Sequence, residues 1–499
     1  MRVLCLGNNT KDTDIRSQKL AATQGLLCHG LLSELENSIP EDFVPCQGYY
    51  HSSVYDITRY NLIKLAEKFD SVIVLDQDCD EYSHPDAFYN TIQTAKQIAQ
   101  IVPVKFLNED HASGISFFEN LVNHNPSFCI FPFIELLVNN SNTTVCCRSQ
   151  TPIVAIDNLQ NYATDSNYQA IRSKMVAGQK IPEHCGSCYH YEDLGIRSAR
   201  QQETVEWANR LGLNSLEDLA QIQHPVYYEV RPSNVCNLQC RMCVPESSHL
   251  IAKEYQQLGL IKNYQNLEYT NFDFVKIEYI KKLYVAGGEP TAMPEFYDFL
   301  DRCIQLQHTN FEFVINTNAT KINNKFRQQM QQFSNLQFTI SVDGVGDLNH
   351  YIRWPSNWNN IIDNVHYLQD NNHVISFNIT VSIYNILRFH ELLKFLDSEF
   401  SGALVHVQLA ASVDDRLSAL NYPDSNEVLS TLIEIRKLNN YRNDPLLASF
   451  VEGLINHYST DYKHNATKLR EFFKFNDQLD QSRGIVLQNY IPELERVRP

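Results

Sequence analysis

Short apolar runs alternate with amphipathic stretches over residues 220–420. Six of these runs are rich in β-branched residues and have the length of buried strands; they cover residues 226–231, 280–286, 311–316, 336–341, 374–381 and 404–409. Helical spacing of apolar residues fills the intervals, at 246–258, 294–306, 322–333, 359–370 and 387–398. Because strands that alternate with helices form parallel sheets, this segment predicts an α/β fold, a partial (β/α)6 barrel of the TIM type.

Residues 421–499 carry no strand pattern and predict a helical cover over the barrel. Asp424 and Glu427 have the spacing of a capping box before an apolar helical face. Asp444-Pro445 precedes a second amphipathic stretch, with proline at the first helical position. Each of these helices is expected to bury one face against the barrel.

Residues 1–120 predict an N-terminal α/β domain of the Rossmann-like type. No GxGxxG pattern follows its first strand, so the residues do not indicate a dinucleotide site and assign the domain no role. The pattern predicts strands at 2–7 and 71–76 and helices around 15–36, 57–68 and 86–100.

Residues 121–205 have weak periodicity and many cysteines. An Asn/Ser-rich turn joins two apolar segments, which predicts a β-hairpin with strands at 128–138 and 139–147. A helix is expected at 166–177, followed by the sequence CGSC. We expect a small cysteine-rich hairpin and helix module whose thiols are Cys129, Cys146, Cys147, Cys185 and Cys188.

Composition narrows the location and the partners. The 499 residues correspond to about three domains. A net charge of −17 disfavours nucleic acid and anionic membranes as partners. No apolar run approaches the roughly 20 residues of a membrane span, and the first ten residues lack a signal-peptide core, so we expect a cytoplasmic protein. In a reducing compartment its 13 cysteines are free thiols or metal ligands.

Cys236, Cys240 and Cys243 form a CxxxCxxC triplet directly after the first barrel strand. The loop after a barrel strand lies on the face where active sites are built. Three thiolates this close can hold an iron–sulfur cluster and leave one iron without a protein ligand. The alternative is a zinc site, for which His249 is the nearest fourth ligand.

The triplet and the sequence GGEP at 287–290, which closes the second strand, resemble the radical S-adenosylmethionine (radical SAM) superfamily. The resemblance implies that Cys236, Cys240 and Cys243 hold a catalytic [4Fe–4S] cluster. There S-adenosylmethionine is reductively cleaved to a 5'-deoxyadenosyl radical, which abstracts hydrogen from a substrate. It also implies that GGEP binds the amino group of S-adenosylmethionine, because a glutamate and backbone carbonyls supply acceptors.

The ends of the third, fourth and fifth strands resemble the same family, and Arg353 lies nearby as a partner for a carboxylate. The alternative for each polar residue is local turn capping, which Asn, Ser and Asp favour. Met242 stands where many relatives have an aromatic residue, so adenine stacking is not expected there. The cofactor contacts implied in this way are Met242, Gly287, Gly288, Glu289, Pro290, Asn316, Asn318, Ser341, Asp343, Arg353, Thr380 and Ser382, with Asn385 beside them.

The second cysteine group resembles the twitch or SPASM-like module of one radical SAM subgroup, here placed before the barrel. Similarity continues in LDQSRG (479–484) and IPEL (491–494). The resemblance implies an auxiliary iron–sulfur cluster, with a four-thiolate zinc site as the alternative. Neighbours on a strand face opposite ways, so only one cysteine of the Cys146-Cys147 pair joins Cys129, Cys185 and Cys188. We expect Cys147, although alternation allows Cys146 equally.

These expectations combine into one functional hypothesis, a radical SAM oxidoreductase or maturase that acts on a ribosomally made peptide. The alternative substrate is a small molecule such as a sugar, nucleoside or natural-product precursor. A low-potential electron donor, flavodoxin or ferredoxin, is implied as a partner. A different class, a non-catalytic scaffold with structural clusters, would require a degenerate cofactor site, whereas the triplet and GGEP are intact.

Overall fold

The computed structural model describes two compact units. One comprises Met1–His124, Gln201–Ser215 and Asn443–Ser449, and the other Asn125–Arg200, Leu216–Arg442 and Phe450–Pro499. Within them the structure describes residues 2–6, 27–28, 71–74, 104–106, 117–139, 141–149, 151–193, 198–263, 272–410, 414–460, 462 and 465–499. No helix in these ranges is long and apolar enough to cross a membrane.

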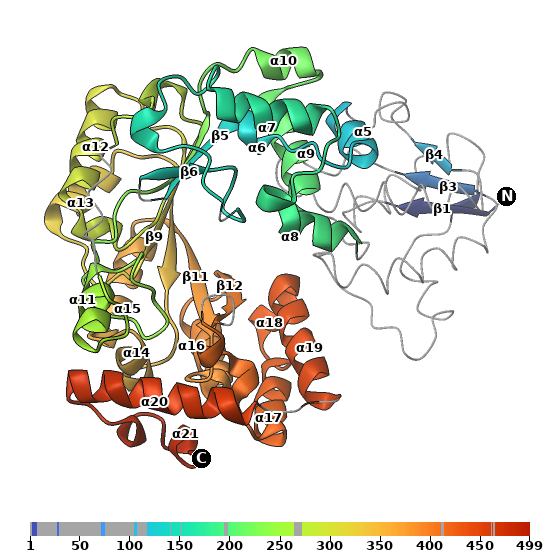
Figure 1. Cartoon of the computed structure of the whole chain (residues 1–499). Coiled ribbons are helices and arrows are strands. Elements are labelled where there is room, and N and C mark those ends of the chain that lie inside the picture. Colours follow the sequence, from blue (N-terminus) through green and yellow to red (C-terminus); the bar gives the residue numbers. More distant parts are fainter. Residues whose placement is uncertain are drawn as a thin grey trace. The chain divides into compact units, whose positions relative to one another are not determined.

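The first unit contains a parallel four-stranded sheet in the order β2-β1-β3-β4. Its strands are Arg2–Leu6, Leu27–Cys28, Ser71–Val74 and Val104–Phe106, in the sequence order β1 to β4, and helix α5 covers Phe117–His124 (Figure 1). Both expected strands are confirmed. The expected helix at 15–36 is wrong at Leu27–Cys28, because these residues pair with β1. The helices expected around 57–68 and 86–100 lie outside the described residues.

The second unit is built on an eight-stranded sheet in the order β12-β11-β10-β9-β8-β7-β5-β6. All six expected barrel strands are confirmed: β7 Tyr227–Arg231, β8 Lys282–Val285, β9 Glu312–Thr317, β10 Leu336–Ser341, β11 Val374–Val381 and β12 Leu404–Leu409. Each is parallel to the next strand along the chain. The sheet is therefore mainly parallel, in agreement with the expected partial barrel.

Helices connect these strands and cover one face of the sheet (Figure 1). The covered face holds the core, because buried positions alternate with half-exposed ones in β8 and β9. The five expected helices are confirmed, and α14 is an addition. Their bounds are α11 His249–Gln257, α12 Pro294–Gln305, α13 Asn324–Met330, α14 Asp347–Ile352, α15 Trp358–Asp370 and α16 Phe389–Glu399.

The expected hairpin consists of β5 (Glu135–Asn139) and β6 (Asn142–Thr144), but both strands are shorter than predicted, and Cys146 and Cys147 lie in a turn after β6 instead of at the end of a strand. Phe131–Ile134 forms a short helix, α6, because Pro132 occupies its first turn. Strand β5 also pairs in parallel with β7, so the hairpin extends the barrel sheet. Cys129 thus precedes a helix instead of beginning a strand, and the boundary of a separate module remains a prediction.

Four helices follow the hairpin: α7 Ser166–Val176, α8 Pro182–Asp193, α9 Ala199–Leu211 and α10 Leu216–Ala220. Helix α7 confirms the expected helix and begins where the carboxylate of Asp165 accepts from the N–H groups of Asn167 and Tyr168. The CGSC sequence lies within α8. Both of its cysteines therefore project from one helix, three residues apart.

The C-terminal residues are helical, as expected. Asp424 caps α17 by accepting from the N–H of Glu427, and the carboxylate of Asp444 accepts from Leu447 at the start of α19. Helix α20 ends at Gly484, whose φ of 64° is the left-handed conformation typical of helix C-termini. The helices are α17 Ser425–Ile435, α18 Asn439–Asn443, α19 Pro445–Ser459, α20 Ala466–Arg483 and α21 Pro492–Glu495.

Candidate active site

The cysteine triplet lies on the loop between β7 and α11. Cys236, Cys240 and Cys243 are all free and partly exposed. Burial raises the pKa of Cys236, and electrostatic repulsion from Cys240, Glu289 and Cys243 adds to this. The N–H of Cys236 donates to Nδ1 of His249 at 3.2 Å, so that nitrogen of the expected fourth zinc ligand is already occupied.

The two glycines of GGEP allow the second loop to press against the cysteine loop. A Cβ on Gly288 would lie 2.0 Å from the carbonyl oxygen of Val235, the residue before Cys236. The N–H of Gly288 donates to Ser233 at 3.0 Å, and that of Glu289 donates to Val235 at 2.7 Å. Gly287 has a φ of 122°, which favours glycine. The two loops implied by the resemblance are therefore in direct backbone contact.

Glu289 does not project from the site. Its side chain is 1% exposed. The carboxylate accepts four hydrogen bonds at 2.7–3.1 Å, from the backbone and hydroxyl of Thr291, the hydroxyl of Thr317 and the N–H of Asn318. Three of these bonds end on Oε1 and one on Oε2, so protein donors take most of the acceptor capacity of this carboxylate. Glu289 joins the end of β8 to the end of β9, while Pro290 begins a buried 3-10 turn, and the expected contact of Glu289 with an amine stays a prediction.

Asn318 also has a different position from the one expected. It is 5% exposed, and its amide donates to the side chain of Asn237 at 2.9 Å, within the cysteine loop. Its side-chain oxygen accepts from Thr320. Asn316 and Ser341, in contrast, are partly exposed and bond to each other at 3.2 Å across β9 and β10. The structure leaves these two available for a ligand.

Asp343 and Arg353 form an ion pair beside the triplet. The Asp343 carboxylate is fully buried, and it accepts from Nη1 of Arg353 at 2.5 Å and from the N–H of Thr380 at 2.8 Å. Burial alone would lower the pKa of Arg353. The negative charges of Cys240 and Asp343 outweigh that effect, so the pKa of Arg353 is raised above its usual value. Nε of Arg353 has no partner among the described residues. Asp343 thus holds Arg353 instead of facing a ligand, which corrects its expected role.

The end of β11 contributes less than predicted. Ser382 and Asn385 are at most 1% exposed, and their side chains bond to each other in a tight turn. Turn capping explains both residues, so the expected placement of Ser382 and Asn385 at the mouth is wrong. Thr380 is partly exposed and accepts from Gln408 at 3.2 Å. Met242 is partly exposed beside Cys243.

Four of the five upstream cysteines form a buried group. Cys129, Cys146, Cys185 and Cys188 are at most 8% exposed. Burial raises the pKa of Cys129, and repulsion from Cys185, Cys146 and Cys188 adds to it. Cys147 is the exposed member of the five. Desolvation of its sulfur, followed by the negative charge of Glu229 on β7, raises the pKa of Cys147 to about 12. Burial thus groups Cys146, and not Cys147, with the other three cysteines, and the identity of the fourth ligand stays a prediction.

Both cysteine sets have the donor chemistry of an iron–sulfur site. Each iron of a cluster takes one thiolate, so the ligands of a cluster need not converge on one point. Within the described ranges, no three His, Cys, Asp or Glu side chains are arranged to hold a single metal ion. The Arg353 guanidinium beside Cys240 supplies a positive charge next to the thiolates, and the triplet therefore fits an anionic cluster.

One buried residue of the loop gave no signal in the sequence. Arg241, between Cys240 and Met242, is completely buried and contacts Asn476 and Asp480 on α20. Asn237 also gave no signal; it is exposed and accepts from the side chain of Asn318. The only available indication was an arginine among cysteines with no acidic residue close in sequence, and that pattern does not identify a partner more than 230 residues away.

Comparisons with known proteins agree with the site. Residues 230–396 match the family model described as the radical SAM superfamily. No curated protein matches the chain. Solved structures that match part of the chain include Streptococcus suis SuiB bound to precursor peptide SuiA. Its identity is 13% and its TM-score 0.30, with 62% of this chain and 64% of SuiB covered. Native anSMEcpe with bound AdoMet has 16% identity and a TM-score of 0.31, with 46% and 61% covered.

The chain spans less than two thirds of the length of these two proteins. The matched segment runs from the end of β7 to α16 and includes the triplet, GGEP and Arg353. Residues 230–396 of the chain are therefore similar to the radical SAM superfamily of enzymes.

Proposed function

We propose that Cys236, Cys240 and Cys243 hold a [4Fe–4S] cluster. When bound, the cluster and S-adenosylmethionine supply reductive cleavage to a 5'-deoxyadenosyl radical, which abstracts hydrogen from the substrate. The observation that carries the proposal is the contact of Gly288 with the backbone before Cys236. It joins the loop with the thiols to the loop that the family uses for the amino group of S-adenosylmethionine.

The protein's own groups have distinct tasks in this proposal. Because the Glu289 carboxylate is buried and already accepts four hydrogen bonds from the protein, the backbone carbonyls of the glycine segment are the acceptors for the amino group. Arg353, fixed by Asp343, has a free Nε for a carboxylate. Asn316 and Ser341 are positioned for hydroxyl groups. Glu289, Asn318 and Asp343 position these groups without contacting a ligand.

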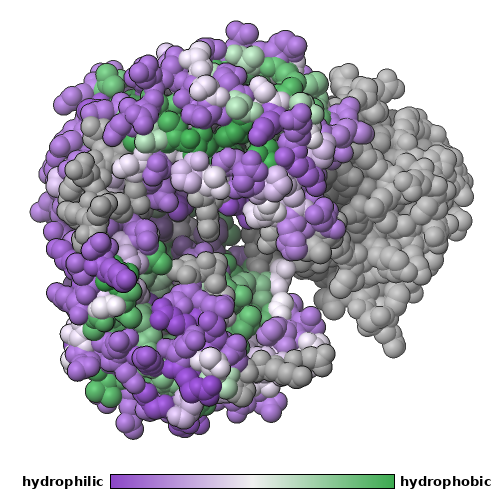
Figure 2. Space-filling model, in the orientation of Figure 1, coloured by the Kyte–Doolittle hydropathy of each residue, from purple (hydrophilic) through white to green (hydrophobic). Residues whose placement is uncertain are grey.

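The substrate proposed is a ribosomally made peptide. The uncovered face of the sheet carries partly exposed polar side chains, which favours a substrate bound through hydrogen bonds; they are Lys282, Tyr284, Glu312, Asn316, Ser341, Asn378 and Thr380. Figure 2 shows a hollow near the centre of this unit's face. The net charge of −17 favours a basic peptide. A small polar molecule is the second candidate, favoured by the same polar lining.

The buried cysteine group is proposed to hold an auxiliary iron–sulfur cluster with Cys129, Cys146, Cys185 and Cys188 as ligands. Their supporting features are burial, mutual proximity and a helix that presents two thiols three residues apart. A low-potential flavodoxin or ferredoxin in the cytoplasm is the proposed electron donor.

Anaerobic reconstitution tests the proposal. The wild-type protein is loaded with iron and sulfide, reduced, and supplied with S-adenosylmethionine, and 5'-deoxyadenosine is measured. Cys240→Ala should form none. No nucleoside from an iron-loaded, reduced wild-type protein would reject the catalytic proposal.

A matched pair tests the auxiliary site. Cys146→Ala should lose the iron of that site, whereas the neighbouring Cys147→Ala should retain it. The reverse result would show that Cys147 is the ligand.

A further inference from the structure

Helix α20 holds the cysteine triplet from inside. Arg241 lies between the second and third cysteines and is 0% exposed. Its Nη1 donates to the side-chain oxygen of Asn476 at 2.8 Å, and its Nη2 donates to the Asp480 carboxylate. The guanidinium is buried, so its positive charge is balanced inside the protein by the carboxylate of Asp480 on α20, more than 230 positions away in the sequence.

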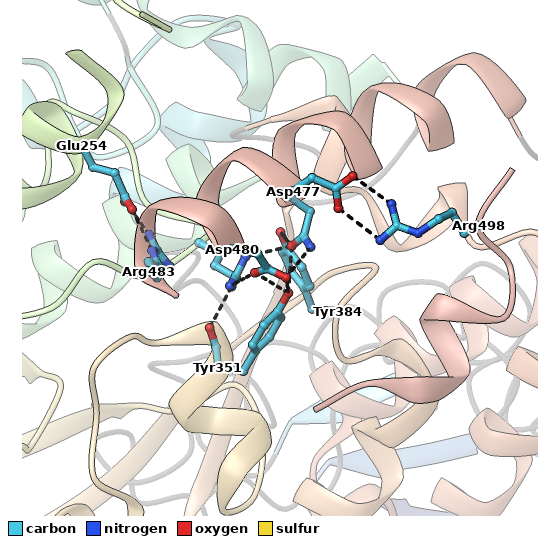
Figure 3. Close-up of polar contacts among 9 residues, drawn as sticks. Glu254, Tyr351, Tyr384, Asp477, Asp480, Arg483 and Arg498 are labelled. Atoms are coloured by element: carbon cyan, nitrogen blue, oxygen red, sulfur yellow. Dashed lines mark hydrogen bonds and ion pairs between the residues drawn. The ribbon is translucent and has the colours of Figure 1, made fainter. Parts of the chain in front are cut away.

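Tyr351 completes the surroundings of Arg241. Nε of Arg241 donates to the carbonyl of Tyr351 at 2.9 Å, and the guanidinium lies 3.7 Å from the centre of the tyrosine ring. The Tyr351 hydroxyl donates to the carboxylate of Asp480 at 3.0 Å. The Tyr384 hydroxyl donates to Asn476 at 3.0 Å. Figure 3 shows Tyr351, Tyr384 and Asp480 converging at one point under α20.

A second ion pair joins α20 to α11, the helix that follows the cysteine loop. Arg483 donates to both carboxylate oxygens of Glu254, at 2.9 and 2.6 Å, and both side chains are only 2% exposed (Figure 3). Glu254 lies on α11, the helix that follows the triplet. Helix α20 therefore contacts the chain at two points, Arg241 within the triplet and Glu254 on α11.

Helix α20 contacts Arg241 and Glu254, and neither residue is one of the three cysteines. These two sets of contacts on α20 restrict the opening of the cysteine loop. Iron leaves a cluster when the ligating loop opens locally, and the population of open loop depends on the contacts that opening breaks. Buried charge-assisted hydrogen bonds are the strongest of these contacts.

We propose that α20 is a positioning element for the triplet, with Asp480 and Asn476 as positioning residues that fix Arg241 and, through it, the spacing of Cys240 and Cys243. The role rests on the proposed function of the triplet. Segment 479–484, noted above for its similarity to the twitch or SPASM-like subgroup, contains both Asp480 and Arg483.

Asp480→Asn tests the role, because it keeps the shape of the side chain and removes the charge. The matched control is Asp477→Asn, on the same helix, where the carboxylate pairs with Arg498 and is 55% exposed. Both variants carry Cys146→Ala, so that only the triplet binds a cluster. The readouts are iron per protein, the rate of iron release to a ferrous chelator, and the EPR spectrum of the reduced cluster.

Asp480→Asn should release iron about 10-fold faster, because a charge-assisted bond is lost, and should change the EPR spectrum. Asp477→Asn should match the parent. Tyr384→Phe, a milder change that removes one hydroxyl, should release iron about 3-fold faster and keeps the test valid if Asp480→Asn fails to fold. Iron release equal to the parent in Tyr384→Phe and in folded Asp480→Asn would overturn the role of α20. A parent protein that takes up no iron would instead reject the proposed function.

Discussion

Gly288→Ala would force the two loops of the site apart. The added Cβ would lie 2.0 Å from the carbonyl oxygen of Val235, 2.5 Å from its carbonyl carbon and 2.8 Å from that of Asn234. These are backbone atoms, so no flexible side chain can give way. The loops must separate by roughly 1 Å, because interiors are packed to van der Waals contact.

The magnitude follows from what that separation breaks. Overpacking of a close contact costs about 1–3 kcal/mol. The bonds from Gly288 to Ser233 and from Glu289 to Val235, at 3.0 and 2.7 Å, would also be strained, at about 1 kcal/mol each. We expect a loss of about 3–5 kcal/mol in the stability of this region, with S-adenosylmethionine cleavage reduced because both loops move.

Gly453→Ala is the matched control. Gly453 lies within α19, and nothing lies within 4 Å of the added Cβ. Alanine should therefore stabilise that helix by about 0.5–1 kcal/mol. Urea unfolding followed by circular dichroism, together with 5'-deoxyadenosine formation, compares the two variants. A Gly288→Ala protein with the wild-type midpoint and wild-type cleavage would refute the close contact.

Three further outcomes are expected. Glu254→Gln should destabilise the protein by about 3 kcal/mol in urea unfolding, because it leaves Arg483 charged and buried, and a loss below that of an exposed pair such as Arg436–Glu452 would contradict this. Asp343→Asn should raise the KM for S-adenosylmethionine more than it lowers kcat, since it frees Arg353 without removing it, and an unchanged KM would count against the role of Arg353. Burial lowers the pKa of His373, which packs on Phe338, so its neutral form is favoured in the folded state. Stability from this group should be complete above about pH 6.5 and should fall as the pH drops below it, and His373→Gln should show a shallower fall between pH 7.5 and 5.5 in urea midpoints.

The barrel was predictable because its signal is local. Each strand carries its own apolar run, and each helix its own face, so six strands and five helices follow from short windows of sequence. The pairing of β5 with β7 was not predictable in this way, since register across distant segments leaves no local pattern. Pro132 did offer a local indication that the residues just before β5 form a helix and not part of the strand.

The site separates in the same manner. The positions of the cysteines and of GGEP along the chain are a matter of spacing, whereas the direction of a side chain is set by its partners. Glu289 faces inward because four donors surround it, and Cys146 joins the buried group while Cys147 faces Glu229. The alternation expected of a strand does not apply to the two cysteines, because both lie in a turn after β6.

The bond between Arg241 and Asp480 joins residues 239 positions apart, and this has a consequence during synthesis. At about 5–20 residues per second, Asp480 is added roughly 10–50 s after Arg241. During that interval the triplet can emerge without the helix that later fixes it. Insertion of iron and sulfide on the ribosome would meet an open loop, whereas insertion after release must wait for α20 to part from it.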